Sequence, residues 1–127
     1  MIEINPPNIN GSYHGHPTLF LAGSIEMGKA IDWQTTVVTA LVDITGEIYN
    51  PRRKDWDDSW IQSVENEKFR EQVEWELTNL DRCKKVLFNF IGGTKSPVTL
   101  MELGLRAALQ PMDEYRQSLL VICPKDF

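Results

Sequence analysis

Short apolar runs alternate along the chain with longer segments in which apolar residues recur every three or four positions. Four runs end at or directly before Gly, Pro or Asn and are typical of buried strands: "TLFLAG", "EIYN", "KKVLFNFI" and "QSLLVICP". The segments 29–46, 64–83 and 98–110 have helical spacing. The order strand, helix, strand, loop, helix, strand, helix, strand predicts an α/β fold whose parallel sheet is covered on both faces.

The domain organisation follows from where this pattern begins. Residues 1–17 are rich in Pro, Asn and Gly without a period, so we expect a loose N-terminal arm, followed by a single domain over 18–127. Ligands of parallel sheets bind at the carboxyl ends of the strands. The candidate site therefore comprises the segments 22–28, 50–60 and 91–104.

Composition narrows the classes of partner. Hydrophobic residues make up 42% and charged residues 24% of the 127 positions, which is ordinary for a globular protein. The net charge of -5 argues against a sequence-independent grip on nucleic acid. Neither a membrane-spanning run nor a leader-like N-terminus is evident. We expect a cytoplasmic protein that binds a small molecule.

Cysteine and histidine positions give no support for a metal site. Cys83 and Cys123 lack the CxxC spacing of zinc ligands and are expected to be buried thiols in a reducing compartment. His14 and His16 form a pair, but no third ligand stands at suitable spacing. We expect no metal.

Glu76 interrupts the apolar arc of the helix predicted over 64–83. It lies three residues after Val73 and four before Leu80, where a core helix would carry Leu. A buried carboxylate is costly unless it is hydrogen-bonded or paired. Two interpretations remain open. Glu76 lies at the end of the arc, where its carboxylate reaches water or bonds a neighbouring backbone group, or it is a carboxylate of the site.

Glu102 is a second acid beside an apolar stripe. Ser96 is a good N-cap and Pro97 suits the first helical position, which places Glu102 about a turn and a half into the helix. It is either the partner of Arg106 in an i,i+4 ion pair or a site carboxylate. It sits on the edge of the expected apolar face, formed by Val98, Met101, Leu105 and Leu109.

Four motifs together resemble the nucleoside 2-deoxyribosyltransferase-like family: "LFLAGSI", "NPRRKDW", "EQVEWELTNL" and "SPVTLMELG". The similarity runs from Leu19 to Pro124, and four motifs in the right order are more specific than any one alone. It implies a flavodoxin-like or Rossmann-like three-layer sandwich with a mostly parallel sheet of four to five strands. It also implies cleavage of the N-glycosidic bond of 2'-deoxynucleosides or their 5'-monophosphates, without a cofactor, by a homo-oligomer. The sugar passes to another base or to water.

The resemblance assigns roles to both acids. Glu102 matches the nucleophile that forms a covalent deoxyribosyl-enzyme, and Glu76 matches the acid that transfers a proton to the leaving base. Arg52 and Arg53 are candidates to bind a phosphate and Trp56 to stack on a base, although a solvated charged loop with a packed Trp explains them equally. The substrate-binding candidates are Phe20, Gly23, Ser24, Asn50, Arg52, Arg53, Trp56 and Ser96.

Some positions depart from the family pattern. Phe20 stands where members often carry a Tyr that bonds the nucleophile, Lys84 replaces an Asp, and Ser96 replaces an acidic residue. The chain also stops at Phe127, whereas members complete the site with a C-terminal segment. Phe20 and the short C-terminus favour a rival hypothesis, a non-catalytic nucleotide-binding module, while the presence of Glu76 and Glu102 favours an enzyme.

Overall fold

A computed structural model describes residues 1–127 except 10, 12–14, 27–28, 58 and 111–115. The strands are β1 (Ile2–Ile4), β2 (Thr18–Gly23), β3 (Glu47–Tyr49), β4 (Lys85–Asn89) and β5 (Ser118–Ile122). The helices are α1 (Trp33–Ala40), α2 (Glu67–Arg82) and α3 (Pro97–Leu109). Within this described part of the chain, no helix is long and apolar enough to cross a membrane.

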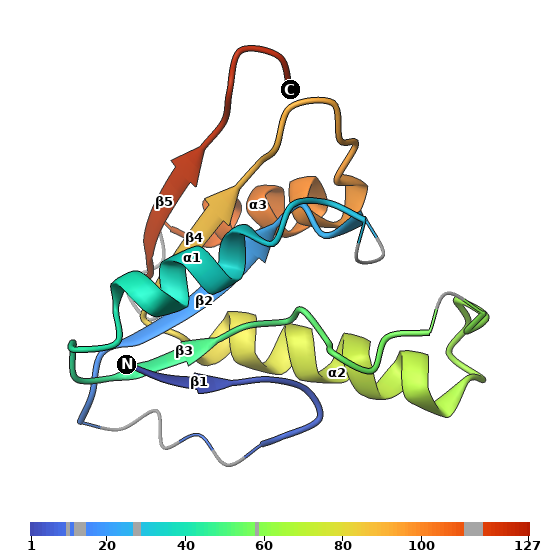
Figure 1. The fold of residues 1–127 in the computed structure, drawn as a ribbon, viewed down its shortest axis with the longest axis horizontal. Helices are drawn as coiled ribbons and strands as arrows, with labels where there is room; N and C mark the ends of the chain where they lie inside the picture. Colours follow the sequence, from blue (N-terminus) through green and yellow to red (C-terminus); the bar gives the residue numbers. More distant parts are fainter. Residues whose placement is uncertain (10, 12–14, 27–28, 58, 111–115) are drawn as a thin grey trace.

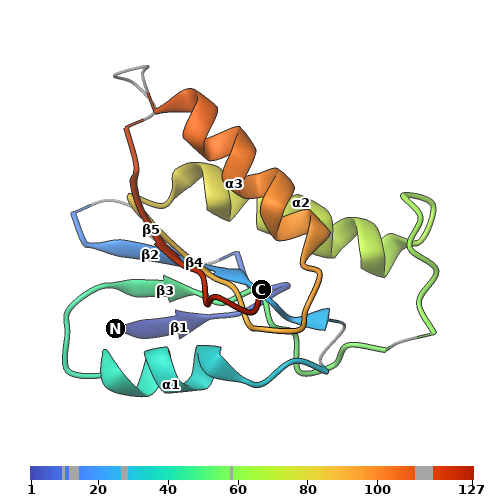
Figure 2. The same ribbon diagram turned by 90° about the horizontal axis from the view of Figure 1, so that it is seen from above.

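The five strands form one parallel sheet in the order β1-β3-β2-β4-β5 (Figure 1). Helix α1 covers one face, and α2 and α3 lie side by side on the other (Figure 2). The chain passes from β2 to β3 on one side and then crosses from β3 to β4 on the other side of β2, so the strand order reverses at β2. The predicted α/β three-layer sandwich is therefore confirmed, and the reversal marks where a ligand site is expected.

Alternating side chains of the central strands supply the core of both layers. Phe20 and Phe88 join the cluster under α2 and α3, together with Trp75. Leu21 and Leu87 face the other way and pack with Trp33 of α1. Both faces of β2 and β4 are thus apolar, which explains why these strands appear in the sequence as continuous hydrophobic runs.

The N-terminal segment differs from the loose arm expected over residues 1–17. Ile2–Ile4 forms β1, which pairs in parallel with β3 and places Ile2 opposite Glu47. Ile4 is buried in the core. A strand of three residues carries too little periodicity to stand out in the sequence, and it is ordered by the hydrogen bonds of its neighbour.

Two further expectations are corrected. The first helix is shorter than predicted, because Asp32 accepts a hydrogen bond from Thr35 N–H and caps it, and the helix ends at Ala40. Only one of the two cysteines is a buried thiol. Burial raises the pKa of Cys83 to about 12, whereas Cys123 directly follows the edge strand β5 and is exposed.

Gly23 at the end of β2 is expected to tolerate no side chain. A Cβ there would collide with the backbone oxygen of Asn89 and lie 2.6 Å from the Trp33 ring. Gly23→Ala should lower the free energy of unfolding by roughly 2–3 kcal/mol in urea denaturation. The matched control is Gly104→Ala in α3, where an added Cβ meets no atom within 4 Å. The control should be neutral or more stable by up to about 1 kcal/mol, and equal losses in both variants would contradict the argument.

Candidate active site

A cavity of about 410 Å³ opens at the carboxyl ends of β2 and β3. Its walls come from the turn after β2, the loop after β3, the inner face of α2 and the start of α3. The walls thus include all three segments that the sequence predicts for the site, and α2 in addition. Eight of the ten candidate residues line it: Phe20, Gly23, Arg52, Arg53, Trp56, Glu76, Ser96 and Glu102.

Ser24 is a candidate that the structure places behind the cavity wall. Its side chain is buried, and its Oγ lies 2.7 Å from both Ser96 Oγ and Thr94 Oγ1. It also accepts a hydrogen bond from Ile91 N–H at 3.0 Å. These contacts join the turn after β2 to the loop before α3, so Ser24 holds the wall in place.

Ser96 does not cap α3 in the way the sequence indicates. Its backbone is in the left-handed region, with φ of 40°, and its side chain makes no capping hydrogen bond. The hydroxyl is instead engaged by Ser24 and Thr94. Ser96 therefore occupies the expected N-cap position without the side-chain hydrogen bond of a cap, and Pro97 occupies the first helical position.

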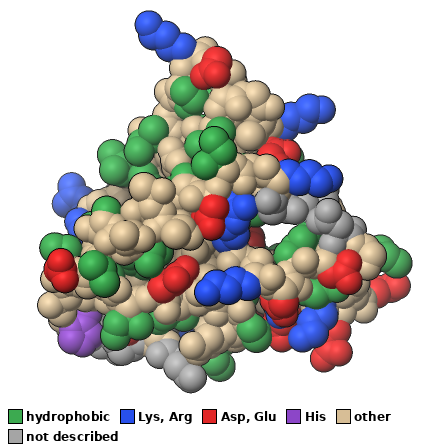
Figure 3. Space-filling model, in the orientation of Figure 1, with side chains coloured by type: hydrophobic (Ala, Val, Ile, Leu, Met, Phe, Trp, Pro, Cys, Tyr) green, Lys and Arg blue, Asp and Glu red, His purple; other side chains and the backbone are tan. Residues whose placement is uncertain are grey.

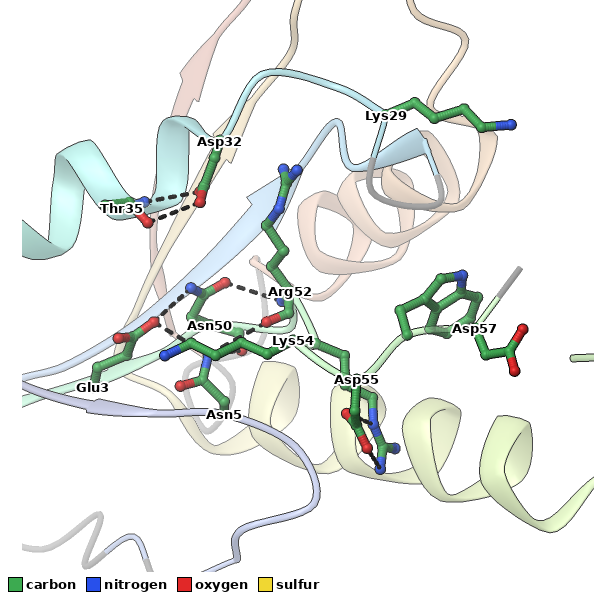
Figure 4. A pocket seen from close by; sticks show the side chains of 12 residues that line it. Glu3, Asn5, Lys29, Asp32, Thr35, Asn50, Arg52, Lys54, Asp55 and Asp57 are labelled. Atoms are coloured by element: carbon green, nitrogen blue, oxygen red, sulfur yellow. Dashed lines mark hydrogen bonds and ion pairs between the residues drawn. The ribbon is translucent and has the colours of Figure 1, made fainter. Parts of the chain in front are cut away.

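Asn50 is the second candidate that lies outside the cavity. Its Nδ2 donates to Glu3 at 2.7 Å, and its Oδ1 accepts from Arg52 N–H at 3.0 Å. It shapes the turn after β3 and lines a more open, polar hollow of about 1020 Å³, seen in Figure 4. The two hollows meet at Arg52, Arg53 and Trp56, which line both.

In the loop after β3, Arg53 is held by ion pairs, while the side chains of Lys54, Asp55 and Asp57 are exposed. Arg53 is buried, and it pairs with Asp55 and Glu71, each at 2.8 Å. The Arg53 guanidinium holds the pKa of Asp55 below its usual value. Figure 3 shows basic and acidic side chains intermixed on this face.

The neighbouring candidates of this loop are also engaged. Arg52 donates to Ala30 O at 3.0 Å and to Gln34 Oε1 at 3.4 Å. The Trp56 ring lies 5.2 Å from the Trp60 ring, and it borders the cavity. Trp56 is thus a packed side chain that still borders the cavity.

Glu76 on α2 faces the cavity and is held by a neighbour that the sequence analysis missed. Gln72, one turn earlier, is buried, and its Nε2 donates to Glu76 Oε1 at 2.5 Å and to Pro51 O at 2.9 Å. Burial raises the pKa of Glu76 to about 7, against the opposing effect of this hydrogen bond. The spacing of four residues before Glu76 is the signal that could have identified Gln72.

Glu102 lies on the buried face of α3, not on the edge of a buried apolar face. It is 6% exposed, and Thr99 and Arg106 are buried on the same side. Thr99 Oγ1 donates to Gly23 O at 3.1 Å, which ties this face to β2. The apolar residues of the expected core face are exposed instead, among them Val98, Met101 and Leu105.

The electrostatic surroundings of Glu102 also differ from the expected ion pair. Arg106 pairs with Asp81 of α2 at 2.9 Å, and no ion pair to Glu102 is found among the described residues. Burial and the nearby charge of Glu76 raise the pKa of Glu102 to about 8, while Arg106 opposes the shift. The two carboxyl groups are thus coupled within one cavity.

A coupled pair of carboxyl groups can divide the work of nucleophile and acid. Between the two pKa values the pair carries one proton, so one carboxyl group is ionised while the other can donate its proton. For metal ions, the described residues contain no group of three His, Cys, Asp or Glu side chains that could hold one. His14 of the histidine pair lies outside the described residues.

A comparison with protein families identifies the chain. A model described as "nucleoside 2-deoxyribosyltransferase like" matches residues 16–127. The chain belongs to this family. The resemblance inferred from the four motifs is therefore confirmed. A comparison with curated proteins finds no match.

Proposed function

We propose that this member of the deoxyribosyltransferase-like family cleaves the N-glycosidic bond of 2'-deoxynucleosides or their 5'-monophosphates. One observation carries the proposal: Glu102 and Glu76, from two different helices, line the same cavity, and each has a raised pKa. Glycosidic bonds are commonly cleaved by a pair of carboxyl groups, one of which holds a proton while the other is ionised. Family membership supplies the nucleoside as the substrate class.

The first half of the reaction divides between the two acids. The ionised carboxylate of Glu102 attacks C1' of the sugar, and a C1'–O bond forms as the C1'–N bond breaks. The protonated carboxyl of Glu76 gives its proton to the departing base nitrogen. Gln72 fixes the Glu76 carboxyl against the loop after β3, because its amide donates to both Glu76 and Pro51.

The second half reverses these steps. A second base or a water molecule attacks C1' and releases Glu102, while Glu76, now ionised, takes up the proton of the attacking group. Two displacements at C1' give net retention of configuration. Side chains supply the nucleophile and the proton, so the scheme uses no cofactor. Transfer and hydrolysis differ only in whether water reaches the covalent intermediate.

The experiment that tests this proposal is mass spectrometry of the intact protein after incubation with 2'-deoxynucleosides and their 5'-monophosphates. Chromatography follows released bases in the same samples. A mass increase equal to a deoxyribosyl or phosphodeoxyribosyl group, together with free base, supports the proposal. Binding without adduct or free base would favour the rival function, a nucleotide-binding module.

Phe20 is the observation that favours this rival. It is buried, lines the cavity, and presents no hydroxyl to orient Glu102. In the described part of the chain no hydrogen bond to Glu102 is found. In the enzyme that we propose, Glu102 is oriented by the packing of α3 on β2, through Thr99 and Gly23.

We also propose that α3 contacts a second copy of the chain. Val98, Met101 and Leu105 expose apolar side chains on its outer face, and Met101 is 65% exposed. Clusters of this kind on a helix face indicate an interface. Membership of the family, for which a homo-oligomer is expected, favours a second copy as the occupant.

Light scattering at micromolar concentration should show an oligomer that Met101→Glu weakens. A charge on this face loses its water when two copies meet, which disfavours association. The matched control is Ile61→Glu, a similarly exposed apolar residue in the loop before α2, and it should leave the mass unchanged. A monomeric wild-type chain would contradict the proposal.

A further inference from the structure

Glu26 fills the position of an anion at the end of the cavity where α3 begins. It follows β2 by three residues and lines the cavity. Its Oε1 accepts hydrogen bonds from the N–H groups of Lys95 and Ser96, each at 3.0 Å. Its backbone is held at φ of 47°, a conformation that side-chain-bearing residues rarely adopt. The chain thus places its own carboxylate where the start of a helix attracts negative charge.

The hydroxyl and guanidinium groups that could bind a phosphate near this end are already engaged. The Ser96 hydroxyl bonds Ser24 and Thr94. The Arg53 guanidinium is paired with two carboxylates, and that of Arg52 is bonded to backbone carbonyls of the segment before α1. A phosphate would have to displace the present partners of these hydroxyl and guanidinium groups before it could bind to them.

The orientation of a substrate follows from the two acids. C1' must lie at Glu102, and the base must lie towards Glu76 on α2 to receive its proton. The remainder of the sugar, including C5', then lies towards the part of the lining that does not belong to α2, which includes Glu26 and Ser96. A neutral 5'-hydroxyl there can donate to the Glu26 carboxylate, whereas a phosphate monoester, with a charge of about -1.5 to -2, is repelled by it.

We propose that Glu26 makes this site selective for nucleosides with a free 5'-hydroxyl over nucleoside 5'-monophosphates. The inference rests on the proposed function for the identity of the ligand, and it narrows that function to one of two substrate classes. Glu26 acts as a specificity-determining residue through its negative charge.

The test compares kcat/KM for a 2'-deoxynucleoside with kcat/KM for its 5'-monophosphate. The wild-type chain should favour the nucleoside by about tenfold or more, and Glu26→Gln should reduce this ratio by a similar factor. The Gln side chain keeps an oxygen that accepts the two N–H groups while it removes the charge. A folding defect would lower both values together and leave the ratio unchanged.

Lys95→Met is the matched control, because the variant keeps the backbone N–H that Glu26 accepts and removes the exposed ammonium beside it. Its ratio should stay within about twofold of the wild-type ratio. A wild-type preference for the monophosphate, an unchanged ratio in Glu26→Gln, or a selective loss of monophosphate cleavage in Lys95→Met would each overturn the inference.

Calorimetric titration with the same two ligands separates this inference from the proposed function. If neither ligand is cleaved, the proposed cleavage fails, and the relative affinities still decide the role of Glu26. Tighter binding of the nucleoside, reduced in Glu26→Gln, supports the inference. Equal affinities, or no binding of either ligand, overturn it.

Discussion

Glu102→Gln should lower the rate of deoxynucleoside cleavage roughly ten-thousand-fold, because the amide cannot attack C1'. The Gln side chain has nearly the same volume as Glu, so the buried face of α3 and the cavity should be retained. Ligand affinity, measured by calorimetry, should change by less than about threefold, since the substituted group acts in the transition state. The deoxyribosyl adduct seen in the intact protein should disappear.

The control for this variant is Glu74→Gln on the outer side of α2. The Glu74 side chain is 71% exposed and lies 3.9 Å from Arg70, a weak surface pair. Its loss should leave turnover and the adduct unchanged. Retention of more than about a tenth of wild-type turnover in Glu102→Gln would remove Glu102 as the nucleophile, because such residues contribute far larger factors.

Wild-type kcat/KM should follow a bell-shaped pH profile with a narrow maximum between the two raised pKa values, about 7 for Glu76 and about 8 for Glu102. Below this range both carboxyl groups are protonated, and no nucleophile is present. Above it both are ionised, and the base leaves without a proton. The active form carries one proton on the pair, on Glu76. Because Glu102 has the higher pKa, this is the less populated of the two singly protonated forms.

Glu76→Gln should lower kcat/KM by roughly a hundred- to a thousandfold and change the shape of this profile. The alkaline limb should vanish, because no acid remains to be ionised. The acid limb should move to lower pH, because the charge of Glu76 no longer raises the pKa of Glu102. Rates across pH 5 to about 9 measure both changes, with Glu74→Gln as the control. A profile with both limbs unshifted would show that Glu76 is not the proton donor.

Much of the fold was predictable because it depends on local patterns. Continuous apolar runs identified β2 and β4, since both faces of these strands are covered. The helical spacing that gave α2 and α3 was similarly clear. Periodicity failed at β1, whose three residues are ordered by pairing with β3, and at α1, whose bounds depend on the Asp32 cap.

For the site, periodicity exposed Glu76 and Glu102 as acids out of place, and the motifs placed both in a family. Periodicity alone could not tell which side of α3 is buried, because an apolar stripe was assumed to face the core. The structure turns that stripe outward and buries Thr99, Glu102 and Arg106. The cause lies in contacts between residues far apart in the chain. Thr99 and Glu102 line the cavity, and Arg106 forms an ion pair with Asp81 of α2.

By itself, the sequence determined the order of elements from β2 onward, the family, and the two acids as candidates, because these follow from neighbouring residues and their spacing. Only the tertiary structure decided that both acids share one cavity. It alone decided that Ser24 and Asn50 support the wall rather than line it, and that Glu26 bonds the N–H groups before α3. These relations join residues that are far apart in the chain, and hydrogen bonds, burial and charge act through distance in space rather than separation in sequence.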